Sequence, residues 1–318
     1  MNWSIWAGQA EHQYLRPKKP EDTPSGNKSL HSQATTPSQF YTLLSLTIPG
    51  CDYLKTKGAE AAVFTLQNKC RNTIWPGILP GSGQIQLMNG GFQLNPGEVV
   101  NVTAPKKWSG RFWPRRFCKF DSAGNGQCLT GDCGGKLQCT GAGGAPPATL
   151  AEFTLDSPVD YYDVSLVDGY NVRVSIEPLS GTGPTCKPIS CLAELNRLCP
   201  VGLQVKRNGH VVACKSACLA YNTPEYCCTG AYATPNSCKP TSYSKVFKAV
   251  CPTSYSYAYD DPTSTFTCQD GNYLIRRYKI AGLLFPWSSH ELFKLLCGVA
   301  DDDRDDSWLD AYDIESTI

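Results

Sequence analysis

Methionine and histidine are scarce in this chain of 318 residues, with two and four copies, and the formal net charge at neutral pH is only +1. A charge balance so close to neutral gives no electrostatic reason to expect binding to nucleic acid or to an anionic membrane. No apolar run approaches the ~20 residues that a membrane-spanning helix needs. We therefore expect no nucleic-acid partner and no transmembrane segment, and we also expect a monomer.

Several chemical motifs are missing from the most cysteine-rich stretch, GNGQCLTGDCGGKLQC at residues 124–139. It contains neither a GxxxxGK[ST] phosphate loop nor a CxxC redox pair. A zinc site needs four cysteine or histidine ligands in closely spaced pairs, but Cys128, Cys133 and Cys139 are separated by four and five residues and no histidine lies nearby. The remaining interpretation is that these cysteines close small loops, with the glycines supplying the backbone angles of tight turns. We expect no metal and no cofactor.

Cysteine itself is abundant, with 17 copies. So many thiols would be a liability in the reducing cytosol, whereas an oxidising compartment converts them into disulfides. We therefore expect a secreted, apoplastic or vacuolar protein. The start of the chain does not read as a secretory leader, because residues 1–39 are polar and rich in proline, and we expect them to be disordered. The short apolar run FYTLLSLTIPG at residues 40–50 is either the remnant of a leader or a buried strand.

From Ala61 onward, short segments of alternating apolar and polar residues are separated by glycine and proline signals. Period-two patterning at this spacing favours a β-sandwich or barrel. In YNVRVSIEP, Val172, Val174 and Ile176 face one way, so that strand has one buried face. From residue 185 to 251 the strand pattern fades and cysteines crowd, with CLAELNRLC as a short predicted helix.

The stretch at residues 124–139 is similar to the signature of the thaumatin-like protein family, the plant pathogenesis-related group that includes osmotin-type antifungal proteins. Further blocks resemble the family in family order: FTLQNKCRNTIWPG, PPATLAEFTL, DVSLVDGYNVRV, CPVGLQVKRNGHVVACKSAC, YCCTGAY and CPTSYSYAYDDPTSTFTC. The resemblance runs from about Ala61 to Ile275. It implies a mainly β fold, a flattened β-sandwich with a disulfide-rich helical and loop domain and a small disulfide-held loop domain.

The resemblance also divides the chain. We expect an atypical, disordered segment at residues 1–58, a thaumatin-like domain at 59–275 with its disulfide-rich subdomain at 185–251, and an atypical segment at 276–318 with an acidic tail. The last segment contains a possible helix, SSHELFKLLCGVA, with capping-box spacing from Ser288 to Glu291. Neither end resembles the family. A gene product with altered ends and a functional tail both stay open as explanations.

Sequence alone cannot choose among the many possible disulfide connectivities, but the family resemblance implies a set of pairs. Carried over position by position, they are Cys118–Cys128, Cys133–Cys139, Cys186–Cys268, Cys191–Cys251, Cys199–Cys214, Cys218–Cys227 and Cys228–Cys238. In the family, the cysteine of the first strand, here Cys70, pairs with one in a terminal TFCP-like segment. This chain reads YLIRRYKIAG there, so Cys51 and Cys297 are the other candidates.

The resemblance further implies an acidic cleft between the sandwich and the disulfide-rich domain, built by one arginine, one glutamate and three aspartates. The matching positions in this chain are Arg111, Glu152, Asp163, Asp168 and Asp260. Two alternatives compete for the arginine, Arg115 and Arg116, and Asp261 competes with Asp260. The plain alternative is that these acids are simply solvated on surface strands.

Asp163 and Asp168 are an odd number of residues apart, so on one unbroken strand they would face opposite sides. Both can line one cleft only if one lies beyond a strand end, and Gly169 makes a turn there plausible. Glycoside hydrolysis needs two carboxyl groups, one as acid and one as nucleophile or base. By resemblance to the weak glucanase activity proposed for some members, we assign Glu152 as the acid and Asp168 as its partner.

Sugar recognition also uses aromatic platforms, and tyrosines and tryptophans flank the proposed cleft residues in sequence. They are Tyr161, Tyr162, Tyr170, Tyr255, Tyr257, Tyr259, Trp108 and Trp113. We expect about half of them to be core residues. The resulting hypothesis is an antifungal plant defence protein that binds β-1,3-glucan or the fungal cell surface. A weak endo-β-1,3-glucanase and an inactive variant with altered ends are the alternatives.

Overall fold

The computed structural model describes residues 61–278. The predictions for residues 1–58, for the helix around Ser288 and for the acidic tail lie outside this range, as do Cys51 and Cys297. The predicted domain limit at Ile275 falls inside strand β13 (Tyr273–Tyr278), which continues the sheet to Tyr278.

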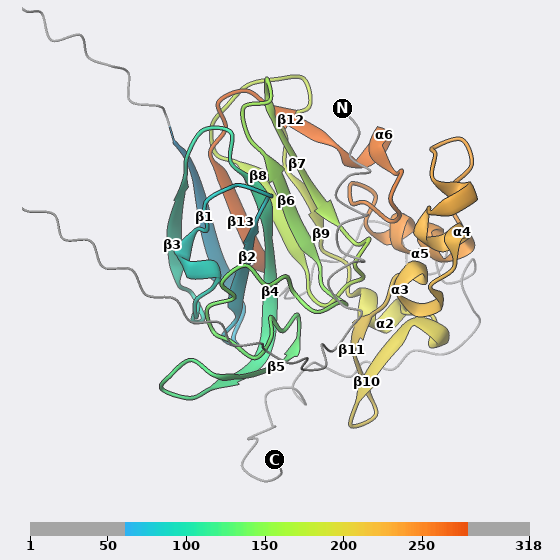
Figure 1. Cartoon of the computed structure of the whole chain (residues 1–318), viewed down its shortest axis with the longest axis horizontal. Helices are drawn as coiled ribbons and strands as arrows, with labels where there is room; N and C mark the ends of the chain where they lie inside the picture. Colours follow the sequence, from blue (N-terminus) through green and yellow to red (C-terminus); the bar gives the residue numbers. More distant parts are fainter. Residues whose placement is uncertain (1–60, 279–318) are drawn as a thin grey trace, which may run out of the picture. The chain divides into compact units, whose positions relative to one another are not determined.

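Two β-sheets build the sandwich (Figure 1). In the five-stranded sheet, the strand order is β3 (Val99–Ala104), β1 (Ala62–Lys69), β13, β8 (Val174–Pro178) and β9 (Ile189–Cys191). The other sheet has the order β12 (Phe266–Cys268), β7 (Asp160–Ser165), β6 (Leu150–Thr154), β4 (Ser109–Phe120) and β2 (Trp75–Pro80), with β5 (Gly126–Thr130) paired to the far end of β4. Only β1 and β13 form a parallel pair among these strands. The mainly β sandwich predicted from the sequence is therefore confirmed.

The sandwich core is aromatic. The ring of Phe64 from β1 lies 4.6 Å from that of Phe153 on β6 and 4.9 Å from that of Phe112 on β4, measured between centroids. These contacts join the two sheets, because inward-facing side chains alternate with outward-facing ones along each strand. The period-two prediction for β8 is confirmed, since Val174 and Ile176 are buried in the same core.

Helices and loops of the cysteine-rich region gather on one side of the sandwich (Figure 1). They comprise α2 (Leu195–Leu198), η2 (Val201–Leu203), the hairpin β10 (Gln204–Arg207) and β11 (His210–Cys214), α3 (Ala217–Tyr221), α4 (Pro224–Cys227), η3 (Gly230–Tyr232), α5 (Ser242–Val250) and α6 (Asp261–Ser264). One further short helix, η1 (Met88–Gly90), lies between β2 and β3. The helix predicted in CLAELNRLC is shorter than expected. It ends at Leu198 because Cys199 precedes Pro200 and is extended.

Seven disulfides staple residues 61–278, and they are the same seven pairs that the family resemblance implies. They are Cys118–Cys128, Cys133–Cys139, Cys186–Cys268, Cys191–Cys251, Cys199–Cys214, Cys218–Cys227 and Cys228–Cys238. The neighbours Cys227 and Cys228 reach separate partners because Cys228 takes a left-handed conformation, with φ of 55°. Cys70 is buried just after the end of β1.

The loop formed by residues 132–139 rests on the fully buried side chain of Arg115. Its guanidinium donates hydrogen bonds to four carbonyl oxygens, those of Trp75 (2.9 Å), Pro76 (3.3 Å), Lys136 (2.7 Å) and Leu137 (2.6 Å). Arg115 therefore ties this loop to strand β2, which makes it a structural residue and removes it as an alternative to Arg111.

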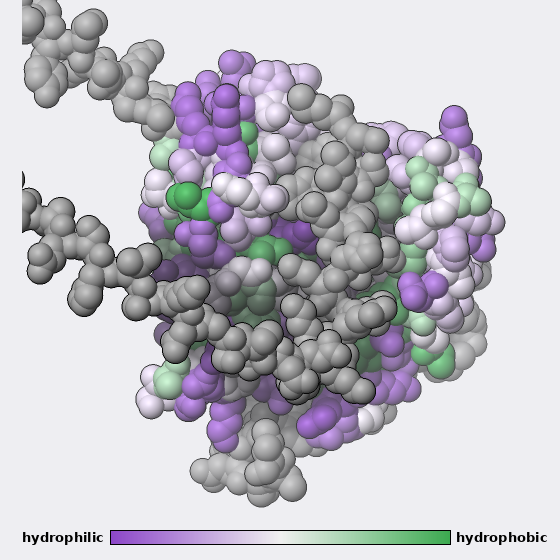
Figure 2. Space-filling model, in the orientation of Figure 1, coloured by the Kyte–Doolittle hydropathy of each residue, from purple (hydrophilic) through white to green (hydrophobic). Residues whose placement is uncertain are grey.

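Hydrophilic residues cover most of the described surface that is visible in Figure 2, and hydrophobic residues appear there in small separate patches. Within residues 61–278, no helix is long and apolar enough to cross a membrane. The same residues contain no cluster of three or more histidine, cysteine or acidic side chains arranged for a metal ion.

Candidate functional site

A row of charged side chains crosses three neighbouring strands of the second sheet. In the strand register, Arg111 on β4 lies opposite Glu152 on β6, and Glu152 lies opposite Asp163 on β7. Residues directly opposite each other in antiparallel strands point to the same face. The next residues along β4 and β6, Phe112 and Phe153, point into the aromatic core, so the charged row faces away from it.

Asp168 joins this row from beyond the end of a strand. Strand β7 ends at Ser165, and the chain turns at Gly169, whose φ of +87° favours glycine. Asp168 therefore lies beyond the strand end, which is the condition under which Asp163 and Asp168 can line the same cleft. As a result, Arg111 contacts two acids at once, with Nε 3.7 Å from Glu152 Oε1 and Nη1 3.8 Å from Asp168 Oδ2.

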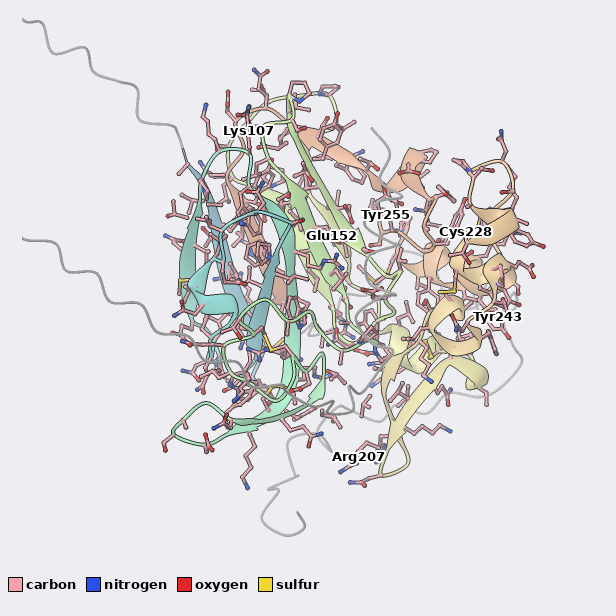
Figure 3. All side chains as sticks on the ribbon, in the orientation of Figure 1. Lys107, Glu152, Arg207, Cys228, Tyr243 and Tyr255 are labelled. Atoms are coloured by element: carbon pink, nitrogen blue, oxygen red, sulfur yellow. A yellow bond between two sulfur atoms is a disulfide. The ribbon has the colours of Figure 1, made fainter. Side chains whose placement is uncertain are left out.

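These residues line a cleft of about 930 Å³ between the sheet and the cysteine-rich region. The far wall comes from α3, α4, α5 and the loop after α5, and it includes the disulfide cysteines Cys218, Cys227, Cys228 and Cys238. Figure 3 labels Glu152 on the sheet side and Cys228 and Tyr243 on the helical side. Five tyrosines line this cleft: Tyr226, Tyr243, Tyr255, Tyr257 and Tyr259.

Asp163 is the most buried acid of the cleft, with 1% of its surface exposed. Its Oδ1 atom is buried and has no hydrogen-bond partner among the residues that the structure describes. Burial first, and then the charges of Glu152 and Asp261, hold the pKa of Asp163 well above its ordinary value, against the opposing charge of Arg111.

The other two acids are shifted in the same direction. Burial raises the pKa of Glu152, and the negative charge of Asp168 raises it further, while Arg111 acts against both effects. Burial also raises the pKa of Asp168, again opposed by Arg111. The cleft therefore concentrates carboxyl groups that hold their protons more tightly than exposed ones.

Comparison with known proteins decides the family. The family model described as "Thaumatin family" matches residues 68–278. A "Thaumatin-like protein" of Arabidopsis thaliana is 57% identical over 219 residues, which is 68% of this chain and 90% of the relative. The chain belongs to the thaumatin family. "Pathogenesis-related thaumatin-like protein 3.5" of Cryptomeria japonica is 58% identical over 217 residues, with coverage of 68% and 90%.

Among solved structures, a laminaripentaose-producing β-1,3-glucanase in complex with laminaritetraose is 12% identical to this thaumatin-family chain. The match covers 68% of this chain and 98% of the glucanase, with a TM-score of 0.48.

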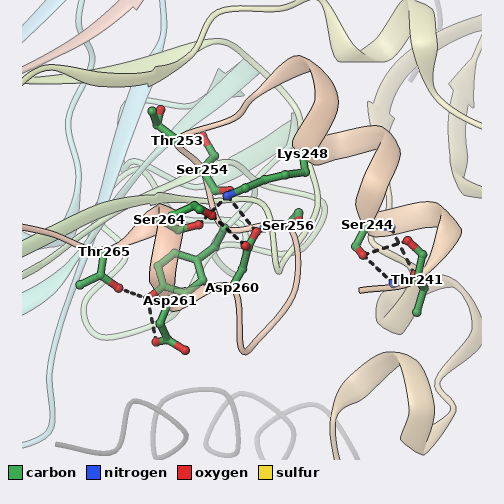
Figure 4. A network of polar contacts seen from close by, with 12 residues as sticks. Thr241, Ser244, Lys248, Thr253, Ser254, Ser256, Asp260, Asp261, Ser264 and Thr265 are labelled. Carbon is green, nitrogen blue, oxygen red and sulfur yellow. Dashed lines mark hydrogen bonds and ion pairs between the residues drawn. The ribbon is translucent and has the colours of Figure 1, made fainter. Parts of the chain in front are cut away.

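The thaumatin-family cleft includes four of the five residues named from the sequence, and Asp260 is the exception. Asp260 does not line the cleft, and its Oδ2 atom lies 3.1 Å from Lys248 Nζ and accepts hydrogen bonds from the backbone nitrogen (3.0 Å) and hydroxyl (2.8 Å) of Ser256. Lys248 also donates to the Ser254 carbonyl and the Ser264 hydroxyl (Figure 4). This network anchors the loop that carries Tyr255, Tyr257 and Tyr259.

Asp261, the alternative to Asp260, is the one whose charge acts on the acidic row. The hydroxyl of Tyr255 donates to Asp261 Oδ1 at 3.0 Å, and the charge of Asp261 contributes to the raised pKa of Asp163. The two neighbouring aspartates thus have different tasks, with Asp260 holding the loop and Asp261 holding a tyrosine that lines the cleft.

The aromatic residues named from the sequence divide as expected into core and cleft. Tyr162, Tyr170, Trp108 and Trp113 are each at most 1% exposed. Tyr255, Tyr257 and Tyr259 line the cleft, whereas Tyr161 does not.

Sequence reasoning missed two further cleft tyrosines, Tyr226 and Tyr243. Their rings pack against the ring of Tyr221 at centroid distances of 5.5 and 5.3 Å, and against each other at 5.8 Å. The capping pair of Thr241 and Ser244 signals the start of α5. No spacing in this region indicates which face Tyr243 takes, so only the folded structure reveals its position.

Asp163→Asn is expected to stabilise the protein at neutral pH by about 1 to 3 kcal/mol, since it removes a buried charge with an unsatisfied oxygen. Because the pKa of Asp163 is raised on folding, the folded state binds more protons than the unfolded state, and the free energy of unfolding falls as pH rises through the folded pKa. The advantage of the variant should therefore shrink at acidic pH. Urea unfolding of the parent and of Asp163→Asn, at neutral and at acidic pH, measures this difference in the free energy of unfolding.

The matched control is Asp270→Asn, which removes the same charge from an exposed position. It should leave the unfolding midpoint unchanged, and asparagine tolerates the φ of 54° at this position. A parent protein at least as stable as Asp163→Asn at neutral pH would contradict the expectation.

Proposed function

We propose that this protein binds β-1,3-glucan of the fungal cell wall in the acidic cleft, as part of plant defence. The observation that carries the proposal is the pairing of two unlike walls, a row of carboxylates around Arg111 and a facing set of tyrosines. The name "Pathogenesis-related thaumatin-like protein 3.5" of the Cryptomeria japonica relative supports the defence role.

The two walls suit the two surfaces of a sugar chain. Glu152 and Asp168 can accept hydrogen bonds from sugar hydroxyls, and Arg111 can donate them. The faces of half-buried Tyr257 and Tyr259 can pack against the C–H faces of pyranose rings, because an aromatic ring offers an apolar platform with a polar tip. A volume of about 930 Å³ lies within the range typical of ligand clefts.

The disulfides support a location outside the cytosol. Seven disulfides in 218 described residues would not persist against cytosolic reductants, so we place the mature protein in the apoplast or the vacuole. The glucan of an invading fungus would be reachable there.

Sedimentation with insoluble β-1,3-glucan tests the proposal. Glu152→Gln and Asp168→Asn each keep the side-chain shape but remove the charge that accepts hydrogen bonds from hydroxyls. Each should weaken binding about tenfold or more, the cost of one charged hydrogen bond. Asp270→Asn, outside the cleft, should bind like the parent. If Glu152→Gln and Asp168→Asn both bound the glucan as well as the parent does, the proposal that the glucan binds in this cleft would be wrong.

A weak endo-β-1,3-glucanase activity is the second candidate, favoured by the raised pKa of Glu152 beside Asp168. A carboxylic acid that keeps its proton can protonate the leaving oxygen of a glycosidic bond, while a neighbouring carboxylate serves as nucleophile or base. In the same experiment, reducing sugar released by the parent and abolished by Glu152→Gln would support the enzyme. Glucan binding without any released sugar would leave the binding function alone.

A further inference from the structure

Negative charge exceeds positive charge in the lining of the cleft. The positively charged lining residues are Arg111 and Lys239, and the acidic ones are Glu152, Asp163, Asp168 and Glu225. The ammonium of Lys239 donates to the Pro235 carbonyl at 3.1 Å, so it is engaged with the backbone of its own loop. Among the described residues of the sheet wall itself, Arg111 is the one lining cation beside three carboxyl groups, and it forms ion pairs with two of them, Glu152 and Asp168.

Asp163 adds a second and independent observation. It lines the cleft with only 1% of its surface exposed, and its buried Oδ1 atom accepts no hydrogen bond from any described residue. A buried carboxylate oxygen without a donor costs free energy, which a ligand that brings a donor and a positive charge would recover. The unsatisfied atom therefore points to a cationic donor as the missing partner.

The facing tyrosines favour the same kind of ligand. Burial and then the charge of Asp163 raise the pKa of Tyr255, so this tyrosine lies near the acidic row. Tyr257 and Tyr259 line the same cleft. Two more tyrosines of the cleft, Tyr243 and Tyr226, pack against each other with ring centroids 5.8 Å apart. The face of an aromatic ring carries partial negative charge and attracts ammonium groups. A cleft lined by both carboxylates and aromatic rings is suited to an ammonium group.

We propose that the cleft binds a primary ammonium group carried on a sugar chain, namely a β-linked glycan with unacetylated amino groups, with Asp163 and Glu152 as the charged acceptors. This inference rests on the proposed function only in treating the cleft as a glycan site. An ammonium group has three donors and no acceptor, which matches oxygens that lack donors, whereas a hydroxyl supplies one donor and no charge.

The charges around Asp163 determine how this binding depends on pH. The titratable groups that act on it are Arg111 from β4, Glu152 from β6 and Asp261 from α6, while Tyr255 from the loop before α6 feels its charge. Asp168, from the turn after β7, lines the same cleft and contacts Arg111. As pH falls, the carboxyl groups with raised pKa become neutral first, so the cleft loses its attraction for the ammonium. Affinity should therefore decrease toward acidic pH although the ammonium keeps its charge.

A glucosamine oligomer, compared before and after N-acetylation, provides the decisive probe because acetylation removes the charge and preserves the sugar backbone. Isothermal titration calorimetry of the full chain in mildly acidic buffer, where the amino groups of the oligomer are protonated, should show binding about tenfold or more tighter for the unacetylated oligomer. A neutral β-1,3-glucan oligomer is titrated in parallel. Equal affinity for the two forms of the glucosamine oligomer would overturn the inference.

Variants locate the effect within the cleft. Asp163→Asn should lose most of the preference for the unacetylated oligomer, whereas Asp270→Asn, with the same change of net charge, should retain it. Urea unfolding confirms that Asp163→Asn is folded. Preference retained by Asp163→Asn would also overturn the inference.

The two proposals fail in different ways. Tight binding of the unacetylated oligomer with none of β-1,3-glucan would refute the neutral glucan as ligand and support the ammonium site. Binding of β-1,3-glucan with no preference for the unacetylated glucosamine oligomer would support the neutral glucan as ligand and refute the ammonium site. Titration in buffers of different ionisation enthalpy gives a further readout, because ammonium binding to carboxyl groups with raised pKa should release protons and glucan binding should release fewer.

Discussion

Arg115→Met is expected to lower the free energy of unfolding by about 3 kcal/mol or more, because several carbonyl oxygens lose their donor at once. The carbonyls that Arg115 serves belong to Trp75 and Pro76 on one side and to Lys136 and Leu137 on the other. Burial lowers the pKa of Arg115 to about 10, so the guanidinium stays charged at neutral pH and its hydrogen bonds are strong. Urea unfolding followed by tryptophan fluorescence measures the loss.

Arg115→Lys should lose nearly as much stability as Arg115→Met. A lysine ammonium is a point donor and cannot reproduce a planar fork that serves four separated oxygens. The matched control is Arg207→Met at the exposed tip of the β10–β11 hairpin, which should change stability by less than about 0.5 kcal/mol. Equal unfolding midpoints for Arg115→Met and Arg207→Met would show that the loop at residues 132–139 holds without the buried guanidinium.

Removing the Cys191–Cys251 disulfide by a double change to alanine is expected to cost about 4 kcal/mol, because the bridge closes a long loop in the unfolded chain. The two cysteines are 60 residues apart and join the edge strand β9 to the end of α5 within the main core. The loss should appear as a lower urea midpoint of the double variant under non-reducing conditions.

The Cys133–Cys139 pair is the natural comparison, since it is also buried but spans only six residues. Loop-closure entropy predicts a loss of roughly 2 kcal/mol for its removal. If both double variants lost equal stability, loop-closure entropy would not explain the contribution of these disulfides. Native packing around the sulfur atoms would then be the better explanation.

Local sequence patterns were sufficient for some parts of the fold. Alternation identified the buried face of β8, because Val174 and Ile176 repeat with the period of the strand. The parity of Asp163 and Asp168 required one of them to lie beyond a strand end, and Asp168 does lie beyond the end of β7. Patterns of this kind succeed where a single strand and its immediate neighbours decide the outcome.

The cleft depends on relations that no local pattern contains. Arg111, Glu152 and Asp163 meet because of the register of three strands, and register is set by turns and packing along the whole sheet. The family resemblance supplied these positions before the register was known. It did not separate Asp260 from Asp261, because the direction of each side chain depends on how Lys248 and Tyr255 pack around them.

The tyrosines of the far wall lie beyond sequence reasoning for another reason. Tyr226 belongs to α4, a helix of four residues that is held by the Cys218–Cys227 disulfide, and Tyr243 belongs to α5, which packs Phe247 into the main core. Helical periodicity over four to nine residues is too short to indicate a buried side.

The two walls of the cleft are fastened by different kinds of bond. Backbone hydrogen bonds between β4, β6 and β7 hold the carboxylates in line, whereas Cys218–Cys227 and Cys228–Cys238 hold the segments opposite them. A reductant attacks only the second kind. We therefore expect the binding proposed for this cleft to depend on oxidation: a newly made chain carries the acidic half of the site from the moment the sheet forms, and gains the other half only after these four cysteines have paired.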